Sequence, residues 1–298
     1  MKIFITGALG FVGKSILNQI RTAGYNILAS TLYNEKIESS YKNIQWIYGD
    51  ISNLNPLKST ISSFNPDIVI HLAWSGIPDY SEVISIANLK SSIQLFEFIL
   101  NETNCKKVIV SGSCFEYGKV NGACRESDPV KINSYIAWAK HALCQYLLLK
   151  CKQNSVDLIW FRIFYVYGAG QRSGSLIPTL IQTLKDGKAP NIRSPFNKND
   201  FIYIEDVAKA FQLAVEIKVE SGIYNLGSGY STSVIDICKI VETLLTGNTV
   251  ISNSLKKVEK GEAIDFWADI SKTYNTFKWK PCFSIEEGVT DIMKSGKS

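Results

Sequence analysis

A glycine-rich segment directly after the first apolar run has the clearest chemical meaning in the sequence. It reads Thr6-Gly7-Ala8-Leu9-Gly10-Phe11-Val12-Gly13 and leads into a segment with helical spacing. One glycine permits a tight turn, one lets backbone N–H groups approach a pyrophosphate, and one lets a helix pack closely on a strand. The spacing is GxxGxxG, and its place between a strand and a helix N-terminus predicts a dinucleotide-binding loop.

Short apolar runs alternate with segments of helical spacing over the first half of the chain. The runs cover Lys2–Thr6, Tyr25–Thr31, Asp67–Ala73, Lys107–Ser111 and Leu158–Phe164, and the helical spacing covers Ser15–Ala23 and Ala87–Leu100. Continuous apolar strands separated by helices indicate a parallel sheet that is covered on both faces. The expected fold class is therefore α/β, with a doubly wound parallel sheet.

The pattern changes after about Tyr167. Residues 168–174 form a polar, glycine-rich loop, and the strands that follow are shorter and further apart. Helical spacing returns at Leu176–Leu184, and strand-helix units are expected at Asp200–Glu216 and Gly222–Leu245. We therefore expect a dinucleotide-binding domain over 1–167 and a smaller α/β domain over 168–298, with some segments packing back on the sheet.

Composition and charge exclude several classes of protein. The 298 residues are 46% hydrophobic and 20% charged, which is typical of a globular enzyme and not of a disordered chain. The 32 Lys and Arg against 27 Asp and Glu give a net charge of +5 without a clustered basic face, so nucleic acid is not an expected partner. No apolar run has the length of a membrane span, and a cytoplasmic location is expected.

The cysteines and histidines argue against metal and disulfide chemistry. The seven cysteines never lie two residues apart, so they are interpreted as reduced thiols. The two histidines, His71 and His141, supply neither a His-rich metal site nor a convincing Ser-His-Asp triad. We expect no metal centre, a packed strand-end position for His71, and a surface position for His141.

Further segments along the chain match a known family in order. They are Gly49–Ile51, Ile70–Trp74, Ser111–Gly118, Arg162–Gly168, Asp200–Val207, Tyr224–Gly229 and Ala268–Lys272. Together with the glycine loop they resemble the extended short-chain dehydrogenase/reductase family, in its nucleotide-sugar epimerase, dehydratase and reductase group. The resemblance covers nearly the whole chain and implies a Rossmann-like dinucleotide domain followed by a mainly substrate-binding domain.

The resemblance implies a set of residues that contact a nicotinamide dinucleotide. The glycine loop and helix start would supply Gly7, Gly10, Phe11, Val12 and Gly13; later strand ends would supply Thr31, Asp50, Ile51, Leu72, Ala73 and Trp74; Lys140, Phe164 and Val166 would complete the set. In such proteins the Asp50 segment contacts the adenine and the Trp74 segment lines the cofactor ribose.

The resemblance also implies hydride transfer between the nicotinamide and a sugar carbon. Tyr135 would exchange a proton with the sugar oxygen, and Ser113 would hydrogen-bond the same oxygen. Lys140 would lower the pKa of the tyrosine and hold the nicotinamide ribose. These three residues are the expected catalytic group.

The spacing of this group departs from the family pattern. The family has YxxxK, whereas the segment from Tyr135 to Lys140 is YxxxxK. In an α-helix, residues four apart diverge by about 40° around the axis and residues five apart by about 140°. We expect a rearrangement, either a π-bulge or a helix that begins only after Tyr135. Otherwise Tyr135 is a surface or core residue and activity is weak or lost.

The residues after Ser113 narrow the reaction. The family's 4,6-dehydratases have an Asp-Glu pair where this chain has Cys114 and Phe115, so dehydration is disfavoured. Its GDP-fucose synthases have a cysteine two residues after the serine, where Phe115 stands here, so 3,5-epimerisation is disfavoured. Strand alternation puts Glu116 on the face opposite Phe115 and predicts a solvated or structural role.

The end of the second strand bears on the choice of cofactor. A site for NAD places a carboxylate there for the ribose 2′-OH, whereas this chain has Ser30 and Thr31, with Lys36 nearby. This favours NADP, with NAD as the alternative. An enzyme that draws on NADPH more often performs a net reduction than a redox-neutral epimerisation.

The substrate side is expected to accept a nucleotide-sugar. The residues expected there are Ser113, Cys114, Phe115, Tyr135, Tyr165, Arg172 and Arg193. Tyr165 stands where the group usually has Asn, and Asn199 stands where it usually has Arg. The phosphate charge is therefore expected to meet Arg172, Arg193 or Lys198, and a guanidinium would do so through bidentate contacts.

Three hypotheses follow. The first is NAD(P)H-dependent reduction of a nucleotide-linked 4-keto-6-deoxy sugar, in deoxysugar biosynthesis for bacterial surface polysaccharide. The second is a nucleotide-sugar 4-epimerase that keeps NAD tightly bound, and the third is a non-catalytic, cofactor-binding protein of the same fold. By family analogy, a homodimer is expected through Ala87–Leu100 and Lys140–Cys151.

Overall fold

The computed structural model describes residues 1–32, 37, 41, 44–255 and 264–295, so Lys36 lies outside the described residues. The chain divides into two compact units. The first contains 1–118, 129–162 and 208–224, and the second contains 119–128, 163–207 and 225–298. The division expected after Tyr167 lies a few residues beyond the break at Arg162. Residues 119–128 also belong to the second unit, and residues 208–224 belong to the first.

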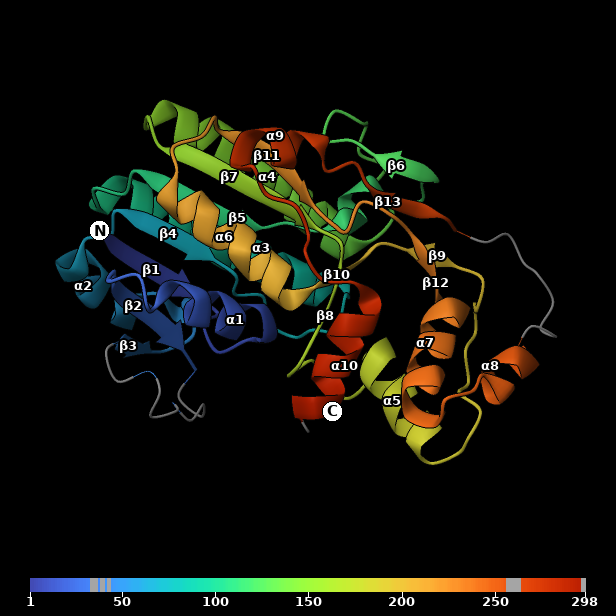
Figure 1. Cartoon of the computed structure of the whole chain (residues 1–298). Helices are drawn as coiled ribbons and strands as arrows, with labels where there is room; N and C mark the ends of the chain where they lie inside the picture. The colour runs from blue at the N-terminus through green and yellow to red at the C-terminus, as the bar shows by residue number, and fades with distance from the viewer. Residues whose placement is uncertain (33–36, 38–40, 42–43, 256–263, 296–298) are drawn as a thin grey trace. The chain divides into compact units, whose positions relative to one another are not determined.

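Seven strands form the sheet of the first unit, in the order β11-β7-β5-β4-β1-β2-β3 (Figure 1). They are β1 (Lys2–Thr6), β2 (Asn26–Thr31), β3 (Gln45–Tyr48), β4 (Ile68–His71), β5 (Lys107–Ser111), β7 (Asp157–Ile163) and β11 (Gly222–Leu226). The sheet is parallel, with Ile5 of β1 opposite both Ala29 of β2 and Ile70 of β4. The predicted α/β class with a Rossmann-like parallel sheet is confirmed.

Helices cover both faces of this sheet. One face packs against α2 (Asn55–Phe64), α3 (Glu82–Glu102) and α4 (Tyr135–Gln153). The other face carries α1 (Phe11–Ile20) and the part of α6 (Ile204–Glu216) that belongs to the first unit. The Gln19 amide donates a hydrogen bond to Gln212 at 2.7 Å, which joins the helices of this second layer.

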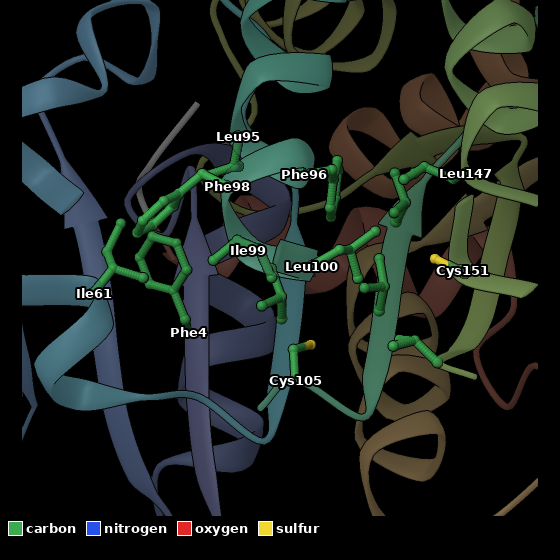
Figure 2. Close-up of a cluster of buried hydrophobic side chains, with 14 of the residues drawn as sticks. Phe4, Ile61, Leu95, Phe96, Phe98, Ile99, Leu100, Cys105, Leu147 and Cys151 are labelled. Atoms are coloured by element: carbon green, nitrogen blue, oxygen red, sulfur yellow. The ribbon is translucent and has the colours of Figure 1, made fainter. Parts of the chain in front are cut away.

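The main core lies between the sheet and helices α2 to α4. Alternate strand residues face it, including Phe4 of β1, Val108 of β5 and Trp160 of β7, and all three are fully buried. Figure 2 shows Phe4 and Ile61 side by side within this cluster. Each fully buried large apolar side chain contributes about 1.5 to 3 kcal/mol, so this layer fixes the strand ends from which a site is built.

Helix α3 has an unusual composition for a surface helix. It is long and apolar enough to cross a membrane by length and composition, but half of its most apolar window is buried inside the protein. A core helix of a folded domain passes the same test, and α3 packs along α4 in the described structure (Figure 1).

The second unit is built from short strands and five further helices. It contains β6 (Gly122–Cys124), β8 (Tyr165–Tyr167), β9 (Lys198–Asn199), β10 (Phe201–Tyr203), β12 (Thr232–Ser233) and β13 (Phe266–Ala268), with α5 (Leu176–Lys185), α7 (Val234–Thr246), α8 (Val250–Ser254), α9 (Ser271–Phe277) and α10 (Ile285–Ser295). In the described residues these strands form two-stranded pairs, β10 with β8, β12 with β9, and β13 with β6, and one isolated bridge joins Lys198 to Asp265.

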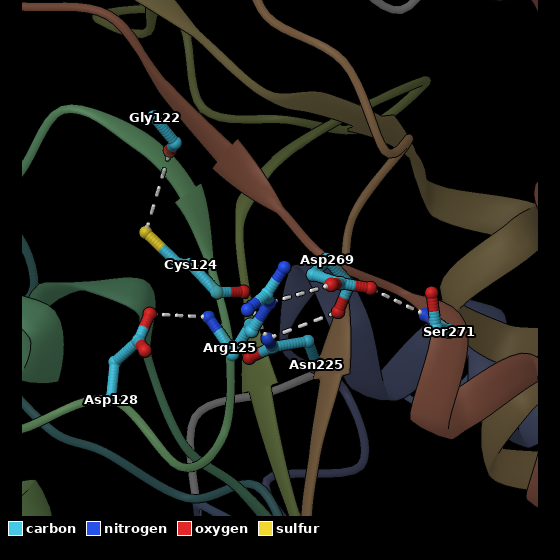
Figure 3. Close-up of polar contacts among 7 residues, drawn as sticks. All are labelled: Gly122, Cys124, Arg125, Asp128, Asn225, Asp269 and Ser271. Carbon is cyan, nitrogen blue, oxygen red and sulfur yellow. Dashed lines mark hydrogen bonds and ion pairs between the residues drawn. The ribbon is translucent and has the colours of Figure 1, made fainter.

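Polar contacts hold these short strands (Figure 3). The Asn225 amide donates to the carbonyls of Cys124 and Asp269, at 2.8 and 3.2 Å. Arg125 Nε donates to the Asp269 carboxylate at 3.2 Å, and the Ser271 N–H donates to the same carboxylate at 2.9 Å. Side chains thus replace the long strand ladders that stabilise the first unit.

Candidate active site

The glycine loop forms a close-packed turn between β1 and α1. Gly7 has φ +70°, and a Cβ there would lie 2.7 Å from the Ala73 nitrogen. A Cβ on Gly13 would lie 2.1 Å from the Gly7 carbonyl oxygen, so the helix approaches the loop backbone in a way that only glycine allows. Gly10 caps α1, which begins at Phe11 and has no acidic side chain in its first turn. The loop therefore presents a helix N-terminus that suits an anion.

A cavity of about 380 Å³ opens beside this loop, at the carboxyl ends of the strands. Of the residues predicted to contact a cofactor, Gly7, Gly10, Thr31, Asp50, Ile51, Leu72, Ala73 and Trp74 line it. Phe11, Val12 and Gly13 form the adjoining start of α1 and do not line the cavity. The position and glycine-walled shape of the cavity fit a dinucleotide.

Several lining residues were not predicted from the sequence. They are Ser30, Leu32, Gly49, Ser52, Ser75, Ile84, Ala87, Asn88 and Ser91. The last four lie on one face of α3, because they follow one another at the helical spacing i, i+3, i+4, i+7. The Asn88 amide donates to the Ser75 carbonyl at 3.0 Å and accepts from its N–H at 2.7 Å, so α3 fixes the loop after β4.

His71 is a packed residue at the end of β4, as expected. Its ring nitrogens lie 2.8 Å from Thr6 Oγ1 and 3.0 Å from Ser92 Oγ. Burial, and then the nearby Lys140 ammonium, lower the pKa of His71 to about 3. The neutral ring therefore joins β1, β4 and α3 and is held in place by both of its nitrogens.

Ser113 begins a short 3₁₀ helix at Cys114–Tyr117, where strand alternation had been assumed to continue. Its Oγ accepts the Phe115 N–H at 3.2 Å, and its own N–H donates to Glu116 Oε1 at 3.0 Å. This capping box turns Glu116 inward. Cys114 is buried, and the half-buried Phe115 ring lies 6.1 Å from the Tyr80 ring.

Glu116 is completely buried and anchors the serine turn to the sheet. Oε1 also accepts the Trp160 indole N–H at 2.9 Å, and Oε2 accepts Arg162 Nε at 3.1 Å. Burial alone raises the pKa of Glu116, but His141, Arg162 and the N–H donors outweigh it and lower the pKa. Of the two roles considered for Glu116, the structural one is therefore what the geometry supports.

His141 is partly enclosed beside this carboxylate, so the expected surface position is wrong. Its side chain is 23% exposed, and Nδ1 lies 3.8 Å from Glu116 Oε2. The reason is the turn at Ser113, which brings the Glu116 carboxylate under α4.

Lys140 comes from the same helix and reaches the strand ends. Its ammonium donates to the Ser111 carbonyl at 2.6 Å and lies 4.5 Å from the centre of the Trp74 ring. The residue is only 9% exposed. Burial, opposed by the charge of Glu116, lowers the pKa of Lys140 to about 8. Trp74, which lines the cofactor-sized cavity, thus lies between that cavity's wall residues and Lys140, which does not itself line the cavity.

Tyr135 does not join Lys140. Helix α4 begins at Tyr135 and is α-helical to Gln153, and the Trp138 N–H bonds the Ser134 carbonyl at 3.0 Å in the regular i to i−4 pattern. Both expected rearrangements, a π-bulge and a later helix start, are therefore wrong, because the helix is regular from its first turn. Ile136, four residues before Lys140, is the residue that points inward and is buried.

Tyr135 instead lines a second, outward groove. This groove measures about 560 Å³ and is lined by Glu82, Ile86, Ile132, Asn133, Ser134, Tyr135 and Trp138. Tyr135 is 50% exposed there. The structure thus brings Lys140 and the Ser113 turn to one edge of the sheet and leaves Tyr135 on another face of α4.

The other predicted residues belong to the second unit. Phe164 is buried, and Tyr165 and Val166 start β8, with the Tyr165 ring 5.7 Å from the Phe201 ring. Arg172 and Arg193 are exposed. Their roles toward a nicotinamide or a phosphate stay predictions. In the part of the chain that the structure describes, no group of three or more His, Cys, Asp and Glu side chains could hold a metal ion.

A glycine-walled cavity at the carboxyl ends of a parallel sheet defines a Rossmann-like, dinucleotide-binding α/β protein. The NAD dependent epimerase/dehydratase family matches residues 3–227, and the chain belongs to this family.

Similar proteins include both reductases and epimerases. A dTDP-4-dehydro-6-deoxyglucose reductase of Escherichia coli is 26% identical, over 98% of this chain and 96% of its own length. The fold matches the Thermotoga maritima UDP-glucose 4-epimerase solved with UDP-glucose, with a TM-score of 0.84 and 22% identity over 100% of both chains. It also matches the Bordetella bronchiseptica enzyme WbmG in complex with NAD, with a TM-score of 0.82 and 19% identity over 99% of this chain and 93% of that one.

Proposed function

We propose that this protein uses a reduced nicotinamide dinucleotide to reduce a nucleotide-linked 4-keto-6-deoxy sugar. The main support is the end of β2, where, among the described residues, the uncharged side chains of Ser30 and Thr31 line the cavity. These two side chains add no negative charge that would repel a ribose 2′-phosphate, so NADPH is the proposed cofactor and NADH the alternative. A reductase consumes NADPH in a net reaction, and similarity to a dTDP-4-dehydro-6-deoxyglucose reductase supports the same substrate class.

The residues after Ser113 support reduction over dehydration. A 4,6-dehydration needs an acid and a base beside the sugar, and a buried thiol at Cys114 and an aromatic ring at Phe115 supply neither. We assign Ser113 to hydrogen bonding of the sugar oxygen and Lys140 to the cofactor side of the cavity. Tyr165, Arg172 and Arg193 are proposed for the nucleotide and phosphate portion, since guanidinium groups favour phosphate.

Loss of NADPH absorbance with a panel of 4-keto-6-deoxy nucleotide-sugars tests this function. Turnover is expected with at least one such sugar and with formation of its 4-hydroxy product. A matched incubation without sugar controls for background oxidation of the cofactor. The proposal fails if the purified protein binds NADPH and reduces no member of the panel.

A nucleotide-sugar 4-epimerase is a second candidate, favoured by the fold match to a UDP-glucose 4-epimerase. Such an enzyme returns the hydride to the sugar, so it keeps its cofactor and shows no net oxidation. Tightly bound NAD in the purified protein, together with interconversion of 4-epimeric sugars, would favour it.

A non-catalytic, cofactor-binding protein is a third candidate. It is favoured because Tyr135 is exposed and the buried Ile136, which has no exchangeable side-chain proton, lies on the side of α4 that carries Lys140. Saturable dinucleotide binding without reduction or epimerisation of any nucleotide-sugar would be its signature.

The outer faces of α3 and α4 support a homodimer. Val83, Ile86, Tyr135, Trp138 and Leu149 are exposed on them at 75%, 45%, 50%, 40% and 68%. Ile86, Tyr135 and Trp138 line one groove there, and apolar side chains grouped in this way favour association with another copy. Sedimentation of the wild type against Trp138→Glu tests this, with a shift toward monomer expected.

We assign the protein to the cytoplasm, in deoxysugar synthesis for bacterial surface polysaccharide.

A further inference from the structure

Reduction of a sugar ketone requires a proton on the carbonyl oxygen as well as a hydride on carbon. Helix α4 presents Tyr135 about 140° away from Lys140 around its axis. The residue about 40° away from Lys140 is Ile136, which carries no exchangeable side-chain proton. The proton donor therefore has to be another group near Lys140 and Ser113.

We infer that the ammonium group of Lys140 is itself the proton donor to the sugar carbonyl oxygen. This inference rests on the proposed reductase function. A bound reduced dinucleotide would supply the hydride for the carbonyl carbon and would itself be oxidised. The carbonyl oxygen takes one N–H proton from Lys140, which gives an alcohol and a neutral amine. A proton from water then restores the ammonium.

The position of Lys140 fits this role. The side chain crosses from α4 to the carboxyl ends of β4 and β5, where Trp74 and Ser111 hold the ammonium. An ammonium has three N–H donors, and within the described residues Ser111 accepts one of them. Two remain for a cofactor ribose hydroxyl and a sugar oxygen. Ser113, two residues beyond Ser111, is the residue proposed above to hydrogen-bond the same oxygen.

The surroundings of Lys140 also favour release of its proton. Burial lowers the pKa of the ammonium to about 8, while the charge of Glu116 opposes this. Glu116 is already engaged with Ser113, Trp160 and Arg162, so its carboxylate stabilises the ammonium only partly. A donor whose pKa lies near the working pH is largely protonated before the reaction, and it also gives up its proton readily during the reaction.

Other titratable groups nearby are less suited. His71 is held by Thr6 and Ser92, and burial lowers its pKa to about 3. The Glu116 carboxylate is buried behind the serine turn, and its pKa is lowered as well. The closest rival is the phenol of Tyr80, whose ring contacts Phe115 beside the serine turn.

Kinetics of Lys140→Arg separate proton donation from charge. Arginine keeps the positive charge and the contact with Trp74, but it does not give up a proton at working pH. We expect kcat to fall about 1,000-fold, while the Kd for NADPH, measured by fluorescence, changes less than about tenfold. Lys150→Arg, on the same helix and paired with Glu97, is the matched control and is expected to retain wild-type kcat.

Tyr135→Phe and Tyr80→Phe test the rival phenols. Each is expected to lower kcat by less than about tenfold. A fall of about 100-fold or more in either variant overturns the inference, as does a Lys140→Arg enzyme that stays within about tenfold of wild type. A wild type that reduces no sugar in the panel overturns the proposed function itself, which distinguishes the two failures.

A second readout does not need turnover. Amines can be trace-labelled with acetic anhydride over a pH series and analysed by mass spectrometry. This gives the half-point, which is the pH at which half of the Lys140 side chains are neutral and can react. We expect this half-point near 8. A half-point near that of a free lysine side chain, about 10.4, contradicts a donor tuned by burial and overturns the inference.

Discussion

The cofactor end and the proton-transfer end of the candidate site lie in the same unit but are built differently. The cofactor end is built around backbone, at the turn of Gly7 and at the strand ends, and residues of α3 complete the cavity wall. The proton-transfer end depends on side chains that reach from different elements, namely Lys140 from α4, Trp74 after β4 and the serine turn after β5.

This difference explains why one end retains the family arrangement and the other departs from it. A backbone cradle depends on glycine at a few positions and tolerates most changes around them. A pair of side chains on a helix depends on angular register, and one extra residue rotates a partner by about 100°. The YxxxxK spacing therefore leaves the cavity intact and moves Tyr135 to an outward groove.

The charge on Glu116 should matter most at the proton-transfer end. Glu116→Gln keeps the shape but leaves the buried Arg162 guanidinium without its carboxylate. We expect the free energy of unfolding to fall by about 3 to 5 kcal/mol, measured by urea denaturation. Asp186→Asn, which removes an exposed pair with Lys188, is the control and should change it by less than about 1 kcal/mol. If Glu116→Gln also lowered the free energy of unfolding by less than about 1 kcal/mol, the buried ion pair between Glu116 and Arg162 would not be what stabilises this end.

Lys140 should give the proton-transfer end a distinctive pH dependence. Its folded pKa of about 8 lies below the value of 10.5 for an unperturbed lysine, so between these pH values the unfolded chain binds more protons. Wild-type stability should therefore gain from this residue as pH rises through that window. Relative to wild type, Lys140→Met should be about 2 to 3 kcal/mol more stable at neutral pH, with the advantage shrinking toward pH 10.5.

Denaturant titrations of both proteins at several pH values check this expectation. Lys150→Met removes a lysine from the same helix, near the surface, and serves as the control for loss of a charge. An advantage of Lys140→Met that does not change with pH would show that burial does not disfavour the ammonium.

The α/β fold class and the glycine loop could be predicted from the sequence because their signals are local. Lys2–Thr6 and Lys107–Ser111 were predicted with the bounds that β1 and β5 have, since buried parallel strands form continuous apolar runs. The glycine loop could be placed because its glycines stand between a strand and a helix. β3 and α2 had weaker apolar patterns and were not predicted.

The proton-transfer end could not be predicted because it depends on contacts distant in sequence. Strand alternation was extended past Ser111, whereas the chain turns into a 3₁₀ helix and buries Glu116 against Trp160 and Arg162. Those partners lie 44 and 46 residues away, and nothing near Glu116 in the sequence indicates them. The same turn encloses His141, which local spacing alone placed at the surface.

The glycine at the start of α1 should be the most sensitive position of the cofactor end. In Gly13→Ala the new methyl group would meet the Gly7 carbonyl oxygen at 2.1 Å, so the loop has to shift. We expect NADPH affinity to fall about 100-fold, measured by fluorescence titration, because the N–H groups lose their common orientation. Gly174→Ala, which points into open space, is the control. Unchanged affinity in Gly13→Ala would mean that the backbone does not form the cofactor site.

The wall at the end of β2 should determine the choice between the two cofactors. Thr31 lines the cavity without a negative charge, so wild-type protein is expected to bind NADPH about tenfold more tightly than NADH. Thr31→Asp adds a carboxylate that repels a 2′-phosphate and accepts a 2′-hydroxyl, and it should remove or reverse this preference. Thr31→Asn introduces a side chain of the same shape as Asp but without the charge, so this variant should keep the preference for NADPH. A wild type that prefers NADH would instead mean that this wall lacks the phosphate site, and an epimerase with tightly bound NAD would become the better account of the cavity.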